Sequence, residues 1–211
     1  MFDIEYKGGN SIVIATKNLK LISDPKLSVI GLKDIGAKDI VELATEERFV
    51  VRNDDARLVV DGPGEYEVGD FSIRGIAATR HIDTDAEPFG TTLYRITIGE
   101  TRIALLGNIS ADLDEDQLEA IGVVNIVIIP VGGGGYTLDA VHAARLVRQI
   151  DPKAVIPVHY ADDAISYEVP QDSLKLFTDE LGVSIETVDK YKVKSVAGLP
   201  PVMTVIEIKR T

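Results

Sequence analysis

Residues 126–160 read IVIIPVGGGGYTLDAVHAARLVRQIDPKAVIPVHY and contain two short apolar runs on either side of a helical pattern. The apolar runs are 126–131 and 154–158, and the amphipathic segment between them is 138–150. This order predicts a βαβ unit with two neighbouring parallel strands. Loops at the carboxyl ends of such strands collect binding and catalytic residues. We therefore expect one wall of any site to lie at the glycines after the first run and at His159.

The bulk composition restricts the class of protein. The chain has 211 residues, 45% hydrophobic and 27% charged, a globular balance that predicts a single domain over 1–211. The net charge of −12 argues against a nucleic-acid partner, which would require a basic face. The absence of cysteine excludes disulfides, thiolate metal sites and cysteine nucleophiles. Because no apolar run is long enough to span a membrane and no signal-peptide pattern is present, we expect a cytoplasmic protein without membrane contacts.

Short strand patterns dominate the rest of the sequence. Strands are predicted at 2–6, 11–15, 19–22, 39–43, 58–60, 65–68, 71–77, 92–98, 102–106, 183–188 and 202–208. Two further helices are predicted, one from Asp112 or Asp114 to Ile121 and one over 170–181, each followed by a glycine. Many strands with helices between strand groups predict an α/β fold of two packed mixed sheets with helices outside, a four-layer sandwich.

The three histidines are the first candidates for a functional site. His159 ends an apolar strand, where a side chain leaves the core and enters a loop-built site, although a structural role is more common for a lone strand-end histidine. His81 lies in a polar loop, as a ligand or as a solvated side chain. His142 shares a helix face with Arg145, which predicts exposure to solvent.

The four consecutive glycines invite a comparison with phosphate-binding loops, because exposed amides before a helix attract anions. The candidate anion ligands are the backbone amides of Gly133, Gly134 and Gly135. The run lacks, however, the Gly-Lys-Ser/Thr ending and the glycine spacing of the nucleotide-binding motifs. The interpretation we favour is a loop that passes close to other backbone, with Thr137 or Asp139 capping the following helix.

Several strings taken together resemble one protein family. They are SDP at 23–25, DGPGEYEVGDFSIRGI at 61–76, LLGN at 105–108, VNIVIIPVGGGGYTLDA at 124–140 and IPVHY at 156–160. The chain is similar, nearly end to end, to the small bacterial and archaeal zinc-dependent hydrolase-like proteins of the metallo-β-lactamase fold. The resemblance implies the αββα sandwich of that fold, in agreement with the strand pattern.

The resemblance also implies that most metal ligands of the family are missing. Its HxHxDH motif falls on residues 45–50, which here read TEERFV. The positions that still match are His81, His159 and Asn108, and Asn108 stands where the family carries a bridging aspartate. Asp24 is expected nearby. Because a neutral amide is a poorer metal ligand than a carboxylate, this set predicts that a dinuclear zinc site cannot form.

Three hypotheses of function follow. The preferred one is a pseudoenzyme of this fold, with no catalytic residue and no required cofactor, that acts by binding or by assembly with itself or an unidentified protein. The second is a hydrolase of small esters, lactones or phosphoesters with one zinc or other divalent ion on His81, His159 and a carboxylate. The third is an anion or nucleotide binder at the glycine run. Histidines that face one cavity would favour the second hypothesis, whereas Arg48 or Phe49 filling that cavity would favour the first.

Overall fold

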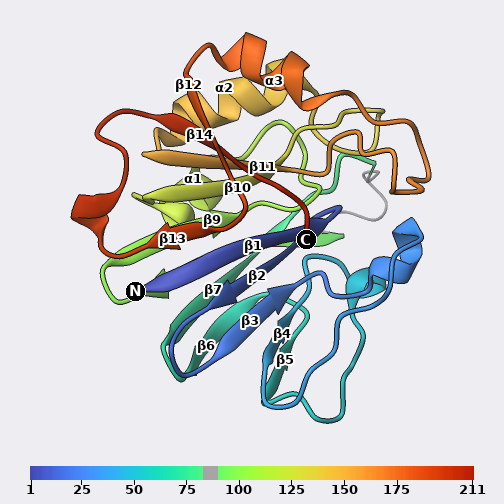
Figure 1. Cartoon of the computed structure of the whole chain (residues 1–211), viewed down its shortest axis with the longest axis vertical. Helices are drawn as coiled ribbons and strands as arrows, with labels where there is room; N and C mark the ends of the chain where they lie inside the picture. The colour runs from blue at the N-terminus through green and yellow to red at the C-terminus, as the bar shows by residue number, and fades with distance from the viewer. Residues whose placement is uncertain (83–89) are drawn as a thin grey trace.

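The computed structural model describes residues 1–82 and 90–211 and contains two mixed β-sheets packed face to face (Figure 1). The first sheet has six strands, in the spatial order β13 (Tyr191–Val193), β1 (Phe2–Gly8), β2 (Ser11–Ala15), β3 (Lys20–Ser23), β4 (Val41–Leu43) and β5 (Leu58–Val60). The pairs from β13 to β3 are antiparallel, and β3, β4 and β5 run parallel. This sheet therefore joins the first strand of the chain to one near its end.

The second sheet has eight strands, in the spatial order β12 (Ser184–Val188), β14 (Thr204–Ile208), β11 (Ala154–Val158), β10 (Ile126–Pro130), β9 (Thr101–Leu105), β8 (Thr91–Ile98), β7 (Phe71–Ala78) and β6 (Gly64–Val68). The strands from β12 to β9 are parallel, and those from β9 to β6 are antiparallel. The predicted βαβ unit is confirmed, because β10 and β11 pair in parallel over their full lengths.

Strand β10 shows how a continuous apolar run is used. Ile126 and Ile128 belong to the core that both sheets share, whereas Val127 and Ile129 belong to the core beneath the helices. Side chains alternate across a strand, so a strand buried on both faces requires apolar residues at every position. The run from which the βαβ unit was predicted is therefore a strand between two cores.

Three α-helices pack on the outer face of the eight-stranded sheet, as Figure 1 shows. They are α1 (Glu115–Ile121), α2 (Ala140–Ile150) and α3 (Leu174–Leu181). In the described part of the chain, the outer face of the six-stranded sheet is covered by irregular segments instead of α-helices. On this face Val13 and Ile22 pack against apolar side chains from those segments, which are Ile35, Ile40 and Ala56. Within residues 1–82 and 90–211, three short 3-10 helices complete the elements: η1 (Leu27–Ile30), η2 (Glu47–Phe49) and η3 (Val196–Gly198).

The structure corrects the predicted start of α3. The helix begins at Leu174 rather than at residue 170, because the preceding backbone bonds elsewhere. The Asp172 N–H donates to the Gly132 carbonyl over 2.6 Å, and the Asp172 carbonyl accepts from the Ala161 N–H over 2.9 Å. Strand β13 was not predicted from the sequence. Within the described ranges, no helix is long and apolar enough to cross a membrane.

Candidate functional site

Four buried polar side chains from four distant parts of the chain meet in one hydrogen-bonded row. The Nδ1 atom of His159 lies 3.1 Å from the Asn10 Oδ1, and the Asn10 Nδ2 donates to the Asn108 Oδ1 over 2.9 Å. The Asn108 Nδ2 then donates to the Glu46 Oε1 over 2.8 Å. Asn10 lies in the turn after β1, and the other three follow β4, β9 and β11. Two predicted site residues, Asn108 and His159, are thus brought together through Asn10.

The row has a direction, because each amide donates at one end and accepts at the other. The Asn10 oxygen accepts, so the His159 ring carries its hydrogen on Nδ1. Burial, and next the positive charge of Arg48, lower the pKa of His159 to about 3. At neutral pH the ring is therefore an uncharged donor at the start of a row that ends on a carboxylate.

Backbone geometry fixes the position of His159. Its φ angle of 52° is left-handed, and its N–H donates to the Gly9 carbonyl over 2.9 Å. The ring stacks on Tyr167 with 4.8 Å between the centroids. A Cβ atom at Gly132 would lie only 2.2 Å from the His159 carbonyl oxygen, so this glycine is required for the close approach of the two loops. The interpretation of the glycine run as a packing element has a direct physical basis at this position.

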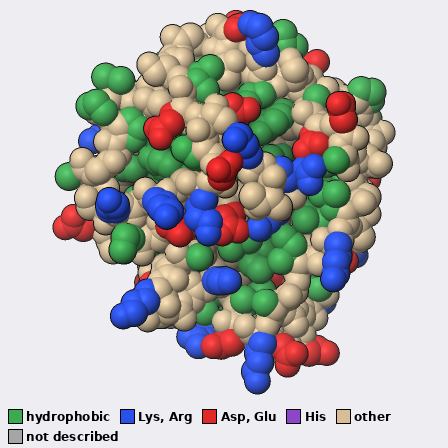
Figure 2. Space-filling model, viewed as in Figure 1, with side chains coloured by type: hydrophobic (Ala, Val, Ile, Leu, Met, Phe, Trp, Pro, Cys, Tyr) green, Lys and Arg blue, Asp and Glu red, His purple; other side chains and the backbone are tan. Residues whose placement is uncertain are grey.

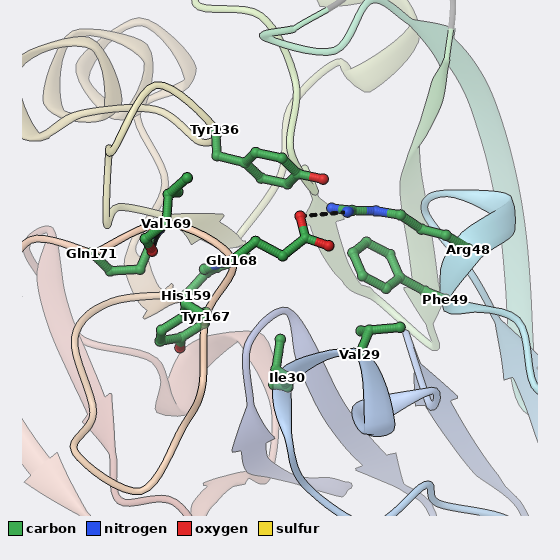
Figure 3. A pocket seen from close by; sticks show the side chains of 10 residues that line it. All are labelled: Val29, Ile30, Arg48, Phe49, Tyr136, His159, Tyr167, Glu168, Val169 and Gln171. Carbon is green, nitrogen blue, oxygen red and sulfur yellow. Dashed lines mark hydrogen bonds and ion pairs between the residues drawn. The ribbon is translucent and has the colours of Figure 1, made fainter.

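Arg48 lies across the same region, on the segment that the resemblance aligns with the family's metal motif (Figure 3). Its Nε is 3.0 Å from the Glu46 Oε2, and its Nη1 donates to the Glu168 Oε2 over 3.3 Å. The guanidinium carbon is 4.4 Å from the Phe49 ring centre and 4.6 Å from that of Tyr136. Glu46 also pairs with Arg80 over 3.3 Å. Arg48 thus links Glu46 to Glu168 and lies against the rings of Phe49 and Tyr136.

Asp24 lies on the neighbouring wall and is used by the backbone. Its carboxylate accepts from the Thr45 N–H over 2.7 Å and from the Thr45 hydroxyl over 2.8 Å. Burial raises the pKa of Asp24 to about 7, against the lowering effect of these hydrogen bonds. Asp24 therefore fixes the start of the segment that carries Glu46 and Arg48.

The remaining candidate ligand, His81, lies at the surface. Its backbone N–H donates to the Asn108 carbonyl over 3.3 Å, which keeps the chain near the row, but the ring joins none of the contacts above. His142 is partly exposed on α2, with 42% of its side chain accessible, and its Nδ1 lies 2.9 Å from the Asp139 Oδ1. The structure therefore does not bring His81, Asn108 and His159 together as three ligands.

These residues do not fit the metal centre that the fold implies. Among residues 1–82 and 90–211, no group of three His, Asp or Glu side chains is placed to hold an ion. Both ends of the Asn108 amide are already bonded, and its N–H side faces Glu46. The Arg48 cation beside Glu46 would repel a divalent ion at that carboxylate.

A small pocket remains between Arg48 and His159. Its other walls include Val29, Phe49, Tyr136, Glu168 and Gln171. Its free volume is about 20 Å³, which is enough for little more than one water molecule. In Figure 3 the Glu168 side chain points into the pocket toward Arg48.

The predicted anion site at the glycine run has its first amide engaged. The Gly133 N–H donates to the Leu138 carbonyl over 3.0 Å. The N-terminus of α2 is capped by Asp139, which accepts from the His142 N–H over 2.9 Å. Gly133, Gly134 and Gly135 all have positive φ angles, which explains the choice of glycine. Anion binding at these three amides stays a prediction.

Sequence reasoning missed several residues of the site. Asn10, Tyr136, Tyr167 and Glu168 were not among the candidates. Glu46 could have been found, because it occupies a ligand position of the family motif and is itself a carboxylate.

Comparison with known proteins places the chain in a family. A profile of the β-lactamase superfamily domain matches residues 3–159. The chain belongs to this superfamily. A metal-dependent hydrolase of Aeropyrum pernix is 31% identical over 80 residues, which are 38% of this chain and 33% of that protein. The chain thus spans about a third of the length of that curated relative.

Solved structures of the superfamily share the fold. A metallo-β-lactamase superfamily protein from Thermotoga maritima matches with a TM-score of 0.77 and 20% identity over 99% of this chain and 100% of its own. Igni18, a metallo hydrolase from Ignicoccus hospitalis, matches with a TM-score of 0.63 and 13% identity over 99% and 95%. The αββα sandwich predicted from the resemblance is confirmed by these matches.

Proposed function

We propose that this member of the β-lactamase superfamily has lost metal-dependent hydrolysis and acts by binding. The observation that carries the proposal is the ion pair between the buried Glu46 and the partly exposed Arg48, with Asn108 donating to the same carboxylate. In the implied arrangement, divalent ions and their ligands would occupy this region. A guanidinium fixed on the chain now supplies the positive charge, and it cannot activate a water molecule as a metal ion does.

The donor chemistry supports the same conclusion. Metal hydrolases hold their ions with neutral imidazoles and carboxylates and leave one position open for water. Here the Nδ1 of His159 is bonded to Asn10, and Glu46 already contacts Arg48, Arg80 and Asn108. Loading an ion at Glu46 would displace Arg48, whose side chain is 28% exposed, from this carboxylate, because a metal ion and a guanidinium at one carboxylate repel each other.

The distribution of charged side chains on the surface argues against a nucleic acid or another polyanion as the partner. On the face in Figure 2, Lys and Arg side chains lie among Asp and Glu rather than in one basic patch. Ion pairs of this kind include Lys190 with Glu5 and Lys209 with Asp189. A nucleic acid would require an uninterrupted basic face.

Metal analysis tests the proposal. The protein is produced in medium supplemented with zinc, iron and manganese, purified without chelators and analysed by plasma mass spectrometry. We expect far less than one ion per chain, and no rise in melting temperature when zinc is added, because a ligand of the folded state must stabilise it. Stoichiometric metal would overturn the proposal.

A hydrolysis assay separates the alternative enzyme. Ester, lactone and phosphoester substrates are tested with the wild type and with His81→Ala and His159→Ala. Turnover that both substitutions abolish would establish the mononuclear hydrolase instead. Turnover that neither substitution changes would not come from these residues.

A further inference from the structure

We propose that the pocket between Arg48 and His159 binds a small free carboxylate, and that Glu168 holds the ligand's position in this structure. The inference rests on the proposed function, because it requires a guanidinium where the family implies metal. Glu168 supplies a carboxylate from the loop between β11 and α3, and its side chain reaches Arg48 from the opposite side of the pocket (Figure 3).

The two carboxylates on Arg48 differ in a way that identifies the exchangeable one. The Glu46 side chain is 2% exposed, accepts hydrogen bonds from Arg80 and Asn108 and forms an ion pair with Arg48, so it is a fixed part of the site. The Glu168 side chain is 57% exposed and contacts Arg48 over 3.3 Å. An exposed pair of this kind is weak, because both partners are hydrated when they separate. A soluble carboxylate can therefore replace Glu168 without changing the charge of the site.

The surroundings of Arg48 favour a planar anion. Phe49 and Tyr136 cover the guanidinium, which lies between the two rings in Figure 3. Only the edge of the guanidinium is left for a ligand, and a carboxylate meets that edge in its own plane through two parallel hydrogen bonds. A tetrahedral phosphate would project oxygens toward the rings.

The rest of the pocket favours a small ligand with a short apolar part. Val29, Ile30 and Val169 line it, beside the polar groups at the Arg48 end. With Glu168 in place the free volume of the pocket is about 20 Å³, which is too small for the ligand. The ligand can therefore enter only when the Glu168 side chain swings outward. The high exposure of the Glu168 side chain permits this movement.

Calorimetric titration tests the inference with defined probes. Acetate, propionate and benzoate are compared with acetamide, propionamide and benzamide, which match them in shape but lack the charge. We expect saturable binding of at least one carboxylate and none of the amides. Inorganic phosphate is the third arm, and phosphate that binds as well as the best carboxylate would overturn the assignment.

Substitution of the competing carboxylate gives a sharper result. Glu168→Gln should bind the carboxylate about two- to fivefold more tightly, because the weak internal competitor is removed. Glu180→Gln is the matched control, since Glu180 is also exposed and pairs with Arg148. Its affinity should equal that of the wild type. Equal affinity in Glu168→Gln would show that Glu168 does not occupy the ligand position.

Two variants test the role of Arg48. Arg48→Lys keeps the charge but loses the planar double contact, and we expect at least a tenfold loss of affinity, about the effect of a lost bidentate pair. The double variant Glu46→Gln with Arg48→Gln removes both charges of the Glu46–Arg48 pair and should fold without binding. Retained binding in the folded double variant would overturn the inference.

The two proposals fail differently. Stoichiometric metal in the wild type would overturn the proposed function whatever the titrations show. A metal-free protein that binds none of the three carboxylates would leave the proposed function standing and overturn only this inference.

Discussion

Asn108 donates an N–H to the Glu46 Oε1 over 2.8 Å, and the two residues are only 1% and 4% exposed. The resemblance to the family places a bridging aspartate at position 108 and a metal motif over the segment of Glu46. An amide and a carboxylate attract each other directly, whereas two carboxylates require a cation between them. The substitution of an amide at position 108 therefore makes the contact stable without metal.

Restoring the aspartate should destabilise this protein. In Asn108→Asp the N–H donor to Glu46 is replaced by a second negative charge in a buried position. We expect the free energy of unfolding to fall by about 2–4 kcal/mol, measured by urea denaturation. Asn125→Asp is the control, because Asn125 uses its Oδ1 to accept from the Arg102 N–H, which an aspartate can also do. A variant that bound zinc and gained stability would contradict this account.

Asp24 should make the free energy of unfolding depend on pH between weakly acidic and neutral conditions. Burial raises the pKa of Asp24 from its ordinary 3.8 to about 7, so between these values the folded protein keeps a proton that the unfolded chain releases. The free energy of unfolding therefore falls as pH rises through this window. Asp24→Asn, which keeps an acceptor for the Thr45 N–H, should lack the effect and gain about 2–4 kcal/mol on the wild type between pH 4 and 8.

The control for Asp24 is Asp70→Asn. Asp70 is exposed and also accepts from a threonine hydroxyl, that of Thr16. Its substitution should leave the pH profile of the wild type unchanged. Parallel profiles of Asp24→Asn and the wild type would count against a proton held at Asp24.

His159 should make the free energy of unfolding depend on pH in the opposite direction, and at acidic pH. Burial lowers the pKa of His159 from 6.5 to about 3. Between these pH values the unfolded chain binds a proton at this residue and the folded protein does not. The free energy of unfolding falls as pH drops from 6.5 toward 3. His159→Asn, a residue that tolerates the left-handed backbone, should show a smaller loss, and His142→Asn, at a partly exposed position, should keep the full loss. Equal acid sensitivity in the two variants would contradict the assignment.

Two glycines of the same run should respond differently to substitution. In Gly132→Ala the Cβ would meet the His159 carbonyl oxygen at 2.2 Å, and we expect a loss of about 3 kcal/mol or more by thermal unfolding. In Gly135→Ala nothing lies within 4 Å of the new Cβ, and the φ angle of 75° leaves only backbone strain, about 1–2 kcal/mol. Equal losses would show that the run is not a packing element.

The fold could be predicted from local patterns. Alternating or continuous apolar runs predicted the strands, because the side-chain period of a strand does not depend on its partners. The βαβ unit followed from the order of β10, α2 and β11. The start of α3 was misplaced because residues before Leu174 bond to the glycine loop, a contact that has no signature in the local sequence.

The sequence by itself determined the sandwich of two sheets, because strand patterns depend on residue types and spacing. Its resemblance to the family predicted that other residues replace the metal motif at 45–50. Only the tertiary structure decided what stands in place of that motif. His159 and Asn10 are 149 residues apart, Asn10 and Asn108 are 98 apart, and Asn108 and Glu46 are 62 apart. The placement of Arg48 between two rings likewise depends on Tyr136, which lies in the distant loop between β10 and α2. Hydrogen bonds and ring contacts form wherever the packed sheets bring side chains within about 3–5 Å, and no local period encodes that proximity.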